Sequence, residues 1–203
     1  MTVDEFRSFA DNLEEPFRTI ALLCVCLGLR ISECLALKWS DVNWLSSKLR
    51  VERGIVAQQV DDVKSEESRK QLTIDRELLA ALKTWKQATQ FSAPDDWVFA
   101  SPYQLGRLPW SYDQVYRVYQ SAAGAAGIGG GFGTHTLRHT CRSWLDSVGT
   151  PVGVQQKLMR HTDIRTTMRY GDAFTSDMAE AHGKVVGLAL NGMESGMESD
   201  VTN

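Results

Sequence analysis

Four short stretches of the chain carry residue types that could act together on a phosphate. They supply two arginines, two histidines, a lysine, a glutamate and a tyrosine: Arg30, Glu33, Lys64, His135, Arg138, His161 and Tyr170. A guanidinium group can donate two parallel hydrogen bonds to two oxygens of one phosphate, and it stays protonated. A phenol has a pKa near 10, so it attacks at neutral pH only with help from a base or a cationic pocket. These residue types therefore suit nucleophilic attack on a phosphodiester.

The HTLRH stretch is predicted to begin a helix directly after the glycine-rich passage GIGGGFG. His135 and Arg138 are three residues apart, so their side chains emerge on one face of that helix. His135 and His139 also have the i, i+4 spacing of a zinc-binding helix. However, Thr136 stands where that motif needs a glutamate, and Arg138 would place a positive charge beside the metal. The stretch favours anion binding, and no metal or cofactor is expected.

His161 and Tyr170 are nine residues apart in RHTDIRTTMRY. On one continuous helix they would lie on nearly opposite faces, because each residue turns the helix by about 100°. Thr162 and Asp163 are good N-caps, so the helix is expected to break after His161 and a new one to end at Tyr170. Both side chains can then face one cleft.

Taken in order, GLRISECLALKWSDV, HTLRHT and HTDIRTTMRY resemble the catalytic domain of the tyrosine recombinases, the phage integrase family, over about residues 3–187. The family pattern is an arginine in G-L-R-x-S-E, a lysine in a β-hairpin, H-x-x-R, and a histidine nine residues before a tyrosine. The resemblance implies an enzyme that cuts and rejoins DNA without metal or ATP, through a 3′-phosphotyrosine link at Tyr170. Arg30 and Arg138 would hold the phosphate.

The resemblance also implies a role for each remaining residue of the set. His135 would accept the proton of the nucleophile, and His161 would hydrogen-bond the phosphate. Lys64 would protonate the departing 5′-oxygen, although Lys70 lies nearby and hairpin lengths vary. Glu33 would support the site without reacting.

One position departs from the family pattern, and one family domain is expected to be absent. Arg160 stands where a glycine is usual, and the chain begins at the catalytic domain, without the N-terminal core-binding domain that clamps DNA. Weak, salt-sensitive binding of double-stranded DNA is therefore expected, by a free monomer that assembles as a tetramer on DNA. The alternatives are a type IB topoisomerase-like DNA-relaxing enzyme and a catalytically silent DNA-binding remnant.

The composition bounds these interpretations without deciding between them. The chain has 203 residues, of which 43% are hydrophobic and 23% charged, as in soluble globular proteins. It has neither a secretion signal nor an apolar run long enough to span a membrane, so a cytoplasmic protein of prokaryotic, phage or mobile-element origin is expected. The net charge of −3 argues against DNA binding, because domains that bind DNA usually carry a net positive charge. Residues 135–170, however, carry six arginines and lysines against two acids.

The elements that must position these residues are mainly helices. Capping and periodicity predict a mainly α fold with one small antiparallel sheet over residues 42–74. Helices are expected over about 2–14, 16–27, 31–38, 111–126, 150–160 and 174–187, and from residues 75 and 134. The four cysteines are expected to be small buried hydrophobes. Residues 1–187 form the predicted catalytic domain, and residues 188–203 are expected to be disordered. The helix 174–187 is expected either to dock on a neighbouring protomer or to pack on its own domain.

Overall fold

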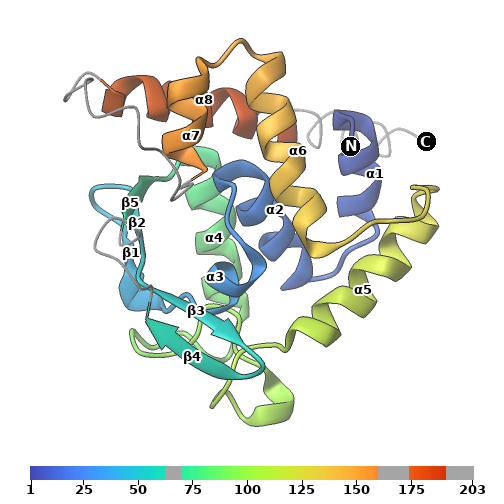
Figure 1. The fold of residues 1–203 in the computed structure, drawn as a ribbon. Coiled ribbons are helices and arrows are strands. Elements are labelled where there is room, and N and C mark those ends of the chain that lie inside the picture. The colour runs from blue at the N-terminus through green and yellow to red at the C-terminus, as the bar shows by residue number, and fades with distance from the viewer. Residues whose placement is uncertain (63–69, 160–173, 191–203) are drawn as a thin grey trace, which may run out of the picture.

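The structure is a computed structural model that describes residues 1–62, 70–159 and 174–190. It confirms a mainly helical fold with small antiparallel sheets (Figure 1). The helices are α1 (Val3–Asp11), α2 (Phe17–Leu27), α3 (Ile31–Leu35), α4 (Arg76–Ala88), α5 (Tyr112–Ala125), α6 (Thr134–Ser147), α7 (Val152–Leu158) and α8 (Phe174–Leu190). The short 3₁₀ helices are η1 (Trp39–Asp41) and η3 (Pro102–Gln104). The strands are β1 (Val42–Asn43), β2 (Lys48–Val51), β3 (Arg53–Val56), β4 (Gln59–Asp62) and β5 (Lys70–Thr73).

Helix α2 forms the centre of the domain, and α1, α3, α4, α5, α6 and α8 all pack against it (Figure 1). Its sequence, FRTIALLCVCL, is apolar on every face, and each of its residues except Arg18 is buried. A helix that is hydrophobic all round is stable only inside the core. The four cysteines are buried free thiols, as predicted.

The predicted helix starts are confirmed at most of the capped positions. Glu5 and Thr2 form a reciprocal capping box at α1, with hydrogen bonds of 2.7 and 3.1 Å. Asp75 and Ser111 cap α4 and α5. Some details were wrong: α1 ends at Asp11 instead of near residue 14, α3 ends at Leu35 instead of near residue 38, and the N-cap of α7 is Pro151, one residue later than predicted.

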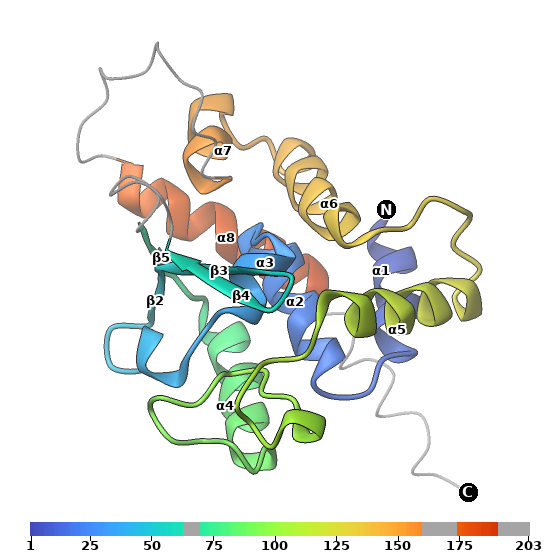
Figure 2. The same cartoon turned by 60° about the horizontal axis from the view of Figure 1, so that its bottom comes forward.

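The strands form two sheets, where the sequence predicted one. Strands β1, β2 and β5 form an antiparallel sheet in the order β1-β2-β5, and β3 pairs only with β4 in a separate hairpin. Glu52 lies between β2 and β3 in neither strand, so the chain changes sheets there. The hairpin lies beside α3 in both views of the ribbon (Figures 1 and 2).

Helix α8 packs on its own domain, where Val185, Val186 and Ala189 are buried. It ends at Leu190, and the carbonyl of Leu188 accepts a hydrogen bond from Arg7 of α1. The expectation of disorder from residue 188 is therefore wrong for residues 188–190, and residues 191–203 lie outside the described residues. None of the described helices has the length and apolar character needed to cross a membrane.

Candidate active site

Arg30 is the N-cap residue of α3, where the chain leaves α2 and turns. The carboxylate of Glu33 accepts one hydrogen bond from the backbone N–H of Arg30 and another from its guanidinium, both of 2.8 Å. Charge-assisted bonds of this length are stronger than neutral ones. The Glu33 side chain is 10% exposed, whereas that of Arg30 is 41% exposed. Glu33 therefore holds Arg30 from the protein side while the guanidinium stays accessible.

Gly28 makes the turn that places Arg30. It ends α2 in the left-handed conformation, with φ of 60°, which costs a residue with a side chain more than it costs glycine. A Cβ atom there would also come within 2.8 Å of the Met159 sulfur. Glycine at position 28 is therefore favoured by both the turn and the close packing against the end of α7.

Arg138 lies in α6 and is nearly buried, with 8% of its surface exposed. Its guanidinium donates hydrogen bonds to the backbone carbonyls of Gly28 and Met159. Arg138 thereby joins the end of α7 to the end of α2, and Gly28 at the end of α2 lies two residues before Arg30. Residues 110 positions apart in the sequence are thus brought into direct contact beside Arg30.

His135 is exposed in the first turn of α6 and lines a groove of about 540 Å³. The other walls are the start of α3 with Ile31 and Ser32, the tip of the β3–β4 hairpin, and the start of α5. The hydroxyl of Thr134, directly before His135, donates a 3.2 Å hydrogen bond to the phenol oxygen of Tyr112. Sequence reasoning missed Tyr112. Tyr112 and Tyr116 are four residues apart at the start of a helix capped by Ser111, so the sequence does place their side chains on one helix face. This spacing could have indicated Tyr112.

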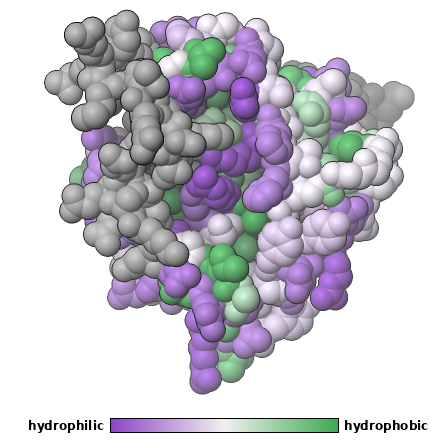
Figure 3. All heavy atoms as spheres, in the orientation of Figure 1, coloured by the Kyte–Doolittle hydropathy of each residue, from purple (hydrophilic) through white to green (hydrophobic). Residues whose placement is uncertain are grey.

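Figure 3 shows the face that is turned to the viewer in Figure 1. Hydrophilic side chains gather in the middle of this face, and apolar side chains form only small patches around them. Within the described ranges, no group of three His, Cys, Asp or Glu side chains is arranged to hold a metal ion.

Several predicted site residues lie outside the described residues: Lys64, Arg160, His161 and Tyr170. The structure describes the chain on either side of Lys64. Strand β4 ends at Asp62, and β5 begins at Lys70, which pairs with Val51. The roles assigned to the whole set, including the described members, remain predictions.

A family model of the phage integrase family matches residues 1–176 of the chain. The chain belongs to this family. The match covers α1 to α7 and includes all seven predicted site residues.

Two curated relatives and one solved structure illustrate the likeness. The type 1 fimbriae regulatory protein FimB of Escherichia coli K12 is 29% identical over 74% of this chain and 70% of its own length. The tyrosine recombinase XerA of Pyrococcus horikoshii is 27% identical over 89% of this chain and 59% of its own length. The Tn1549 transposon integrase, solved in complex with transposon right end DNA, has a TM-score of 0.65 at 19% identity. That match covers 87% of this chain and 61% of the integrase chain.

These matches confirm the fold class and the family resemblance. The chain spans less than two thirds of the length of XerA and of the transposon integrase chain.

Proposed function

We propose that this chain is the catalytic domain of a site-specific DNA recombinase that cuts and rejoins strands through Tyr170. The observation that carries the proposal is the convergence of the motifs in space. Arg138 contacts the turn that leads into Arg30, and His135 lines one groove with the first residues of α3. The motifs are separated by about half of the chain, so an interaction with one ligand explains their convergence.

In the proposed reaction, the phenol oxygen of Tyr170 attacks the scissile phosphorus. An O–P bond to Tyr170 forms while the bond from phosphorus to the 5′-oxygen breaks. The products are a 3′-phosphotyrosine and a free 5′-hydroxyl. The phosphoester bond is kept in the enzyme link, so a second 5′-hydroxyl can reverse the attack without ATP.

The two arginines would stabilise the charge that develops on the phosphate oxygens. Glu33 fixes Arg30, and two backbone carbonyls fix Arg138, so neither cation needs to reorganise as the charge develops. Preorganised donors of this kind usually contribute more to catalysis than any other single effect, and losing one typically costs about 10²–10³ in rate. Arg30→Ala is expected to fall in that range.

The remaining proposed roles concern protons. His135 accepts the proton of the attacking phenol, and its exposed place in the groove gives it access to a ligand. His161 donates a hydrogen bond to the phosphate. Lys64 protonates the departing 5′-oxygen, which is otherwise a poor leaving group. General acid–base catalysis contributes typically about 10²–10⁴ to a rate.

Double-stranded DNA is the proposed partner, and assembly into a tetramer on DNA is proposed with it. The DNA complex of the structurally similar Tn1549 integrase supports the first proposal. For the second, Val185 and Val186 of α8 are buried within their own domain. An interface between protomers would therefore use residues other than Val185 and Val186.

The test is covalent trapping. The protein is incubated with nicked duplex DNA and run on a denaturing gel. A DNA-shifted band is expected with the wild type and with the control variant Tyr103→Phe, because Tyr103 is an exposed phenol on η3, an element that does not line the groove. The band is expected to vanish with Tyr170→Phe. Relaxation of plasmids without strand exchange would favour the topoisomerase alternative, and DNA binding without a band would favour the silent remnant.

A further inference from the structure

A groove of about 750 Å³ runs along one side of α4, and we call it the α4 groove. On the other side of the same helix, Leu78 and Leu82 are buried in the core. The α4 groove shares no lining residue with the groove beside His135, and Figure 2 shows α2 between α4 and α6. The two grooves are therefore separate. The charged and apolar residues that line the α4 groove are Trp44, Arg76, Leu79, Ala80, Lys83 and Lys86.

The charged residues of this lining all have the same sign. Arg76, Lys83 and Lys86 are cations, and no acidic residue of the described ranges lines the groove with them. Within the described part of the chain, none of the three forms an ion pair with a carboxylate. The whole chain has a net charge of −3, so the groove is a local concentration of positive charge on an acidic protein. A cleft lined by charges of one sign attracts a partner of the opposite sign.

Apolar side chains lie between the cations along the helix. Arg76 and Lys83 are seven residues apart, which is two turns and about 10 Å along the axis of α4. Leu79 and Ala80 fall between them on the same face, because residues three and four apart are neighbours on a helix surface. Trp44 lines the same groove from the turn between β1 and β2. The groove therefore has an apolar floor with positive charge at both ends.

Lys86 is held in place at one end of the groove. Its ammonium group lies 4.4 Å from the centre of the Trp39 ring and donates a hydrogen bond to the carbonyl of Ser92. Partial burial lowers the pKa of Lys86, and the carboxylate of Asp96 acts in the opposite direction. Charges interact more strongly where water is partly excluded. An incoming anion would therefore be attracted to Lys86 more strongly than to a fully solvated lysine.

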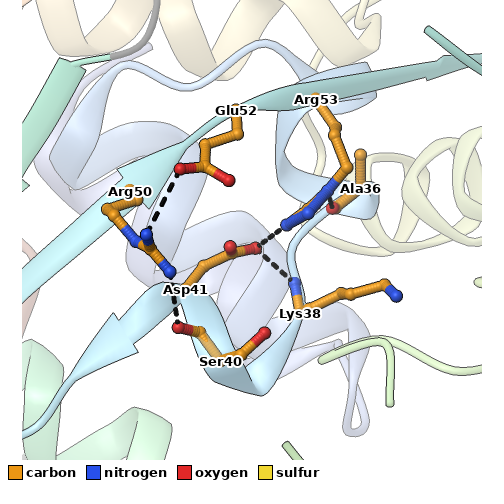
Figure 4. Close-up of polar contacts among 7 residues, drawn as sticks. All are labelled: Ala36, Lys38, Ser40, Asp41, Arg50, Glu52 and Arg53. Carbon is orange, nitrogen blue, oxygen red and sulfur yellow. Dashed lines mark hydrogen bonds and ion pairs between the residues drawn. The ribbon is translucent and has the colours of Figure 1, made fainter. Parts of the chain in front are cut away.

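The aromatic support of Lys86 is fixed from behind. Trp39 is 2% exposed and stacks on Trp44, with ring centroids 6.2 Å apart. Asp41, in the same 3₁₀ helix, accepts hydrogen bonds from the backbone N–H of Lys38, at 2.8 Å, and from the guanidinium of Arg53 (Figure 4). The wall of the groove is thus built before any ligand arrives, which reduces the entropy that binding costs.

We propose that the α4 groove binds an acidic amphipathic helix of a partner protein. Two acidic side chains seven residues apart on that helix would match the spacing of Arg76 and Lys83, with Lys86 beside the second. Apolar side chains one turn from each acid would pack on Leu79 and Ala80, as in other helix-in-groove contacts. A DNA backbone would engage the cations but leave the apolar floor unused, so the floor favours a peptide. This inference is independent of the proposed DNA cleavage.

The test uses a fluorescein-labelled, alanine-rich peptide of about 18 residues, a length at which an isolated helix can form in water. It carries glutamates seven residues apart with leucines one turn inside them. The control peptide has glutamines in place of the glutamates. Fluorescence anisotropy with the full chain should show binding of the acidic peptide, weakened by salt, because added ions screen exposed charges. No binding up to about 1 mM, or equal binding of both peptides, would overturn the proposal.

The main variant is Arg76→Glu/Lys83→Glu, which reverses the charge at both ends of the groove. It should bind the acidic peptide at least about tenfold more weakly, because each change replaces an attraction by a repulsion. The matched control is Arg117→Glu/Arg142→Glu, which makes the same change of charge at exposed positions of α5 and α6. It should alter binding less than about threefold in 0.15 M salt, where charges more than about 8 Å away are largely screened. Equal weakening by both variants would show attraction to net charge alone and would overturn the groove as the site.

Ala80→Gln tests the floor without a change of charge. Ala80 is exposed, so the longer side chain can be accommodated in the free protein but occupies the space of the ligand. We expect binding to weaken at least about fivefold, the lower end of the cost of overpacking. Thermal melting by circular dichroism reports whether each variant is folded. A folded Ala80→Gln that binds like the wild type would overturn the helix-in-groove contact.

Three further outcomes would assign the α4 groove to another occupant and overturn the proposed one. Displacement of the acidic peptide by unlabelled duplex DNA would make the groove a nucleic-acid surface. Much tighter peptide binding by a chain that ends at Leu190 would assign the groove to the protein's own residues 191–203. Self-association in sedimentation experiments that is abolished by Arg76→Glu/Lys83→Glu would assign it to a second copy of the chain.

Discussion

Glu33 holds Arg30 at two points at once. One carboxylate oxygen accepts the backbone N–H of Arg30, and the other accepts its guanidinium, each at 2.8 Å. The first bond caps α3, and the second orients the side chain, so one glutamate sets both the start of the helix and the direction of the cation. An arginine in this position has little freedom to leave its orientation when a phosphate arrives.

Glu33→Gln is therefore expected to slow cleavage more than it weakens folding. The amide oxygen can still accept one of the two hydrogen bonds, so the loss of unfolding free energy should be about 1–3 kcal/mol. The rate of covalent complex formation should fall by at least about tenfold, since the charge that orients Arg30 is lost. Single-turnover trapping on nicked DNA measures the rate, and urea unfolding measures the stability.

The control for this change is Asp4→Asn. Asp4 also pairs with an arginine three residues away, Arg7, but its side chain is 93% exposed and the contact is 3.4 Å. No change in rate or stability is expected there, because exposed pairs contribute little. If Glu33→Gln were as silent as Asp4→Asn, Glu33 would have no part in orienting Arg30.

The sequence was informative wherever a local signal determines the structure. Thr2, Asp75 and Ser111 cap helices because their side chains satisfy backbone N–H groups two or three residues ahead, which can be read from the sequence alone. The same holds for Gly28, whose left-handed conformation ends α2. The order and spacing of the motifs were enough to indicate the family.

What the sequence could not give depends on partners that are distant in the chain. The segment from 42 to 74 was predicted as one sheet, because strand patterns do not reveal that β5 pairs with β2 and not with β4. Likewise, nothing in HTLRH indicates that Arg138 donates to the carbonyls of Gly28 and Met159. Asp41 and Arg53 carried no motif, and their pairing is visible only in the fold.

Gly28→Ala is expected to destabilise the protein by about 2–5 kcal/mol. The left-handed conformation costs a residue with a side chain roughly 1–2 kcal/mol. Overpacking adds about 1–3 kcal/mol, because the new Cβ would lie 2.8 Å from the sulfur of Met159. The matched control is Gly129→Ala, where a Cβ would meet no atom within 4 Å. Urea unfolding measures the free energy of unfolding of both variants. If Gly28→Ala were as stable as Gly129→Ala, the turn between α2 and α3 would tolerate a side chain.

The stability of the protein is expected to fall at alkaline pH because of three buried acidic groups. Burial raises the pKa of the Cys26 and Cys34 thiols and of the Tyr119 phenol well above their ordinary values. The folded state therefore keeps protons that the unfolded state releases. Their contribution is complete below the unfolded pKa values, which lie near 8.5 for cysteine and 10 for tyrosine, and it is lost as the pH rises above them.

Unfolding by urea at pH 7, 9 and 10.5, with a reductant present, measures this loss. Each group that stays protonated in the folded state lowers the unfolding free energy by up to about 1.4 kcal/mol per pH unit above its unfolded pKa. Cys34→Ala should reduce the slope between pH 9 and 10.5 even though it lowers stability at pH 7. A slope that did not change with Cys34→Ala would mean that this thiol ionises in the folded protein.

The end of α8 gives a prediction about how far the folded domain extends. Ala189 is fully buried, and the carbonyl of Leu188 accepts a hydrogen bond from Arg7. A chain that ends at residue 187 loses both contacts, whereas a chain that ends at Leu190 keeps them. We expect the shorter chain to be less stable by about 1–3 kcal/mol, which combines one hydrogen bond with the burial of small apolar groups.

Thermal melting of the two chains measures this difference, because each kcal/mol corresponds to a few degrees in Tm for a domain of this size. The variant Arg7→Met, in the chain that ends at Leu190, removes this hydrogen bond together with the exposed Arg7–Asp4 pair, which contributes little. It should account for about 1 kcal/mol of the difference. Equal melting temperatures for the two chain lengths would place the end of the folded domain at or before residue 187.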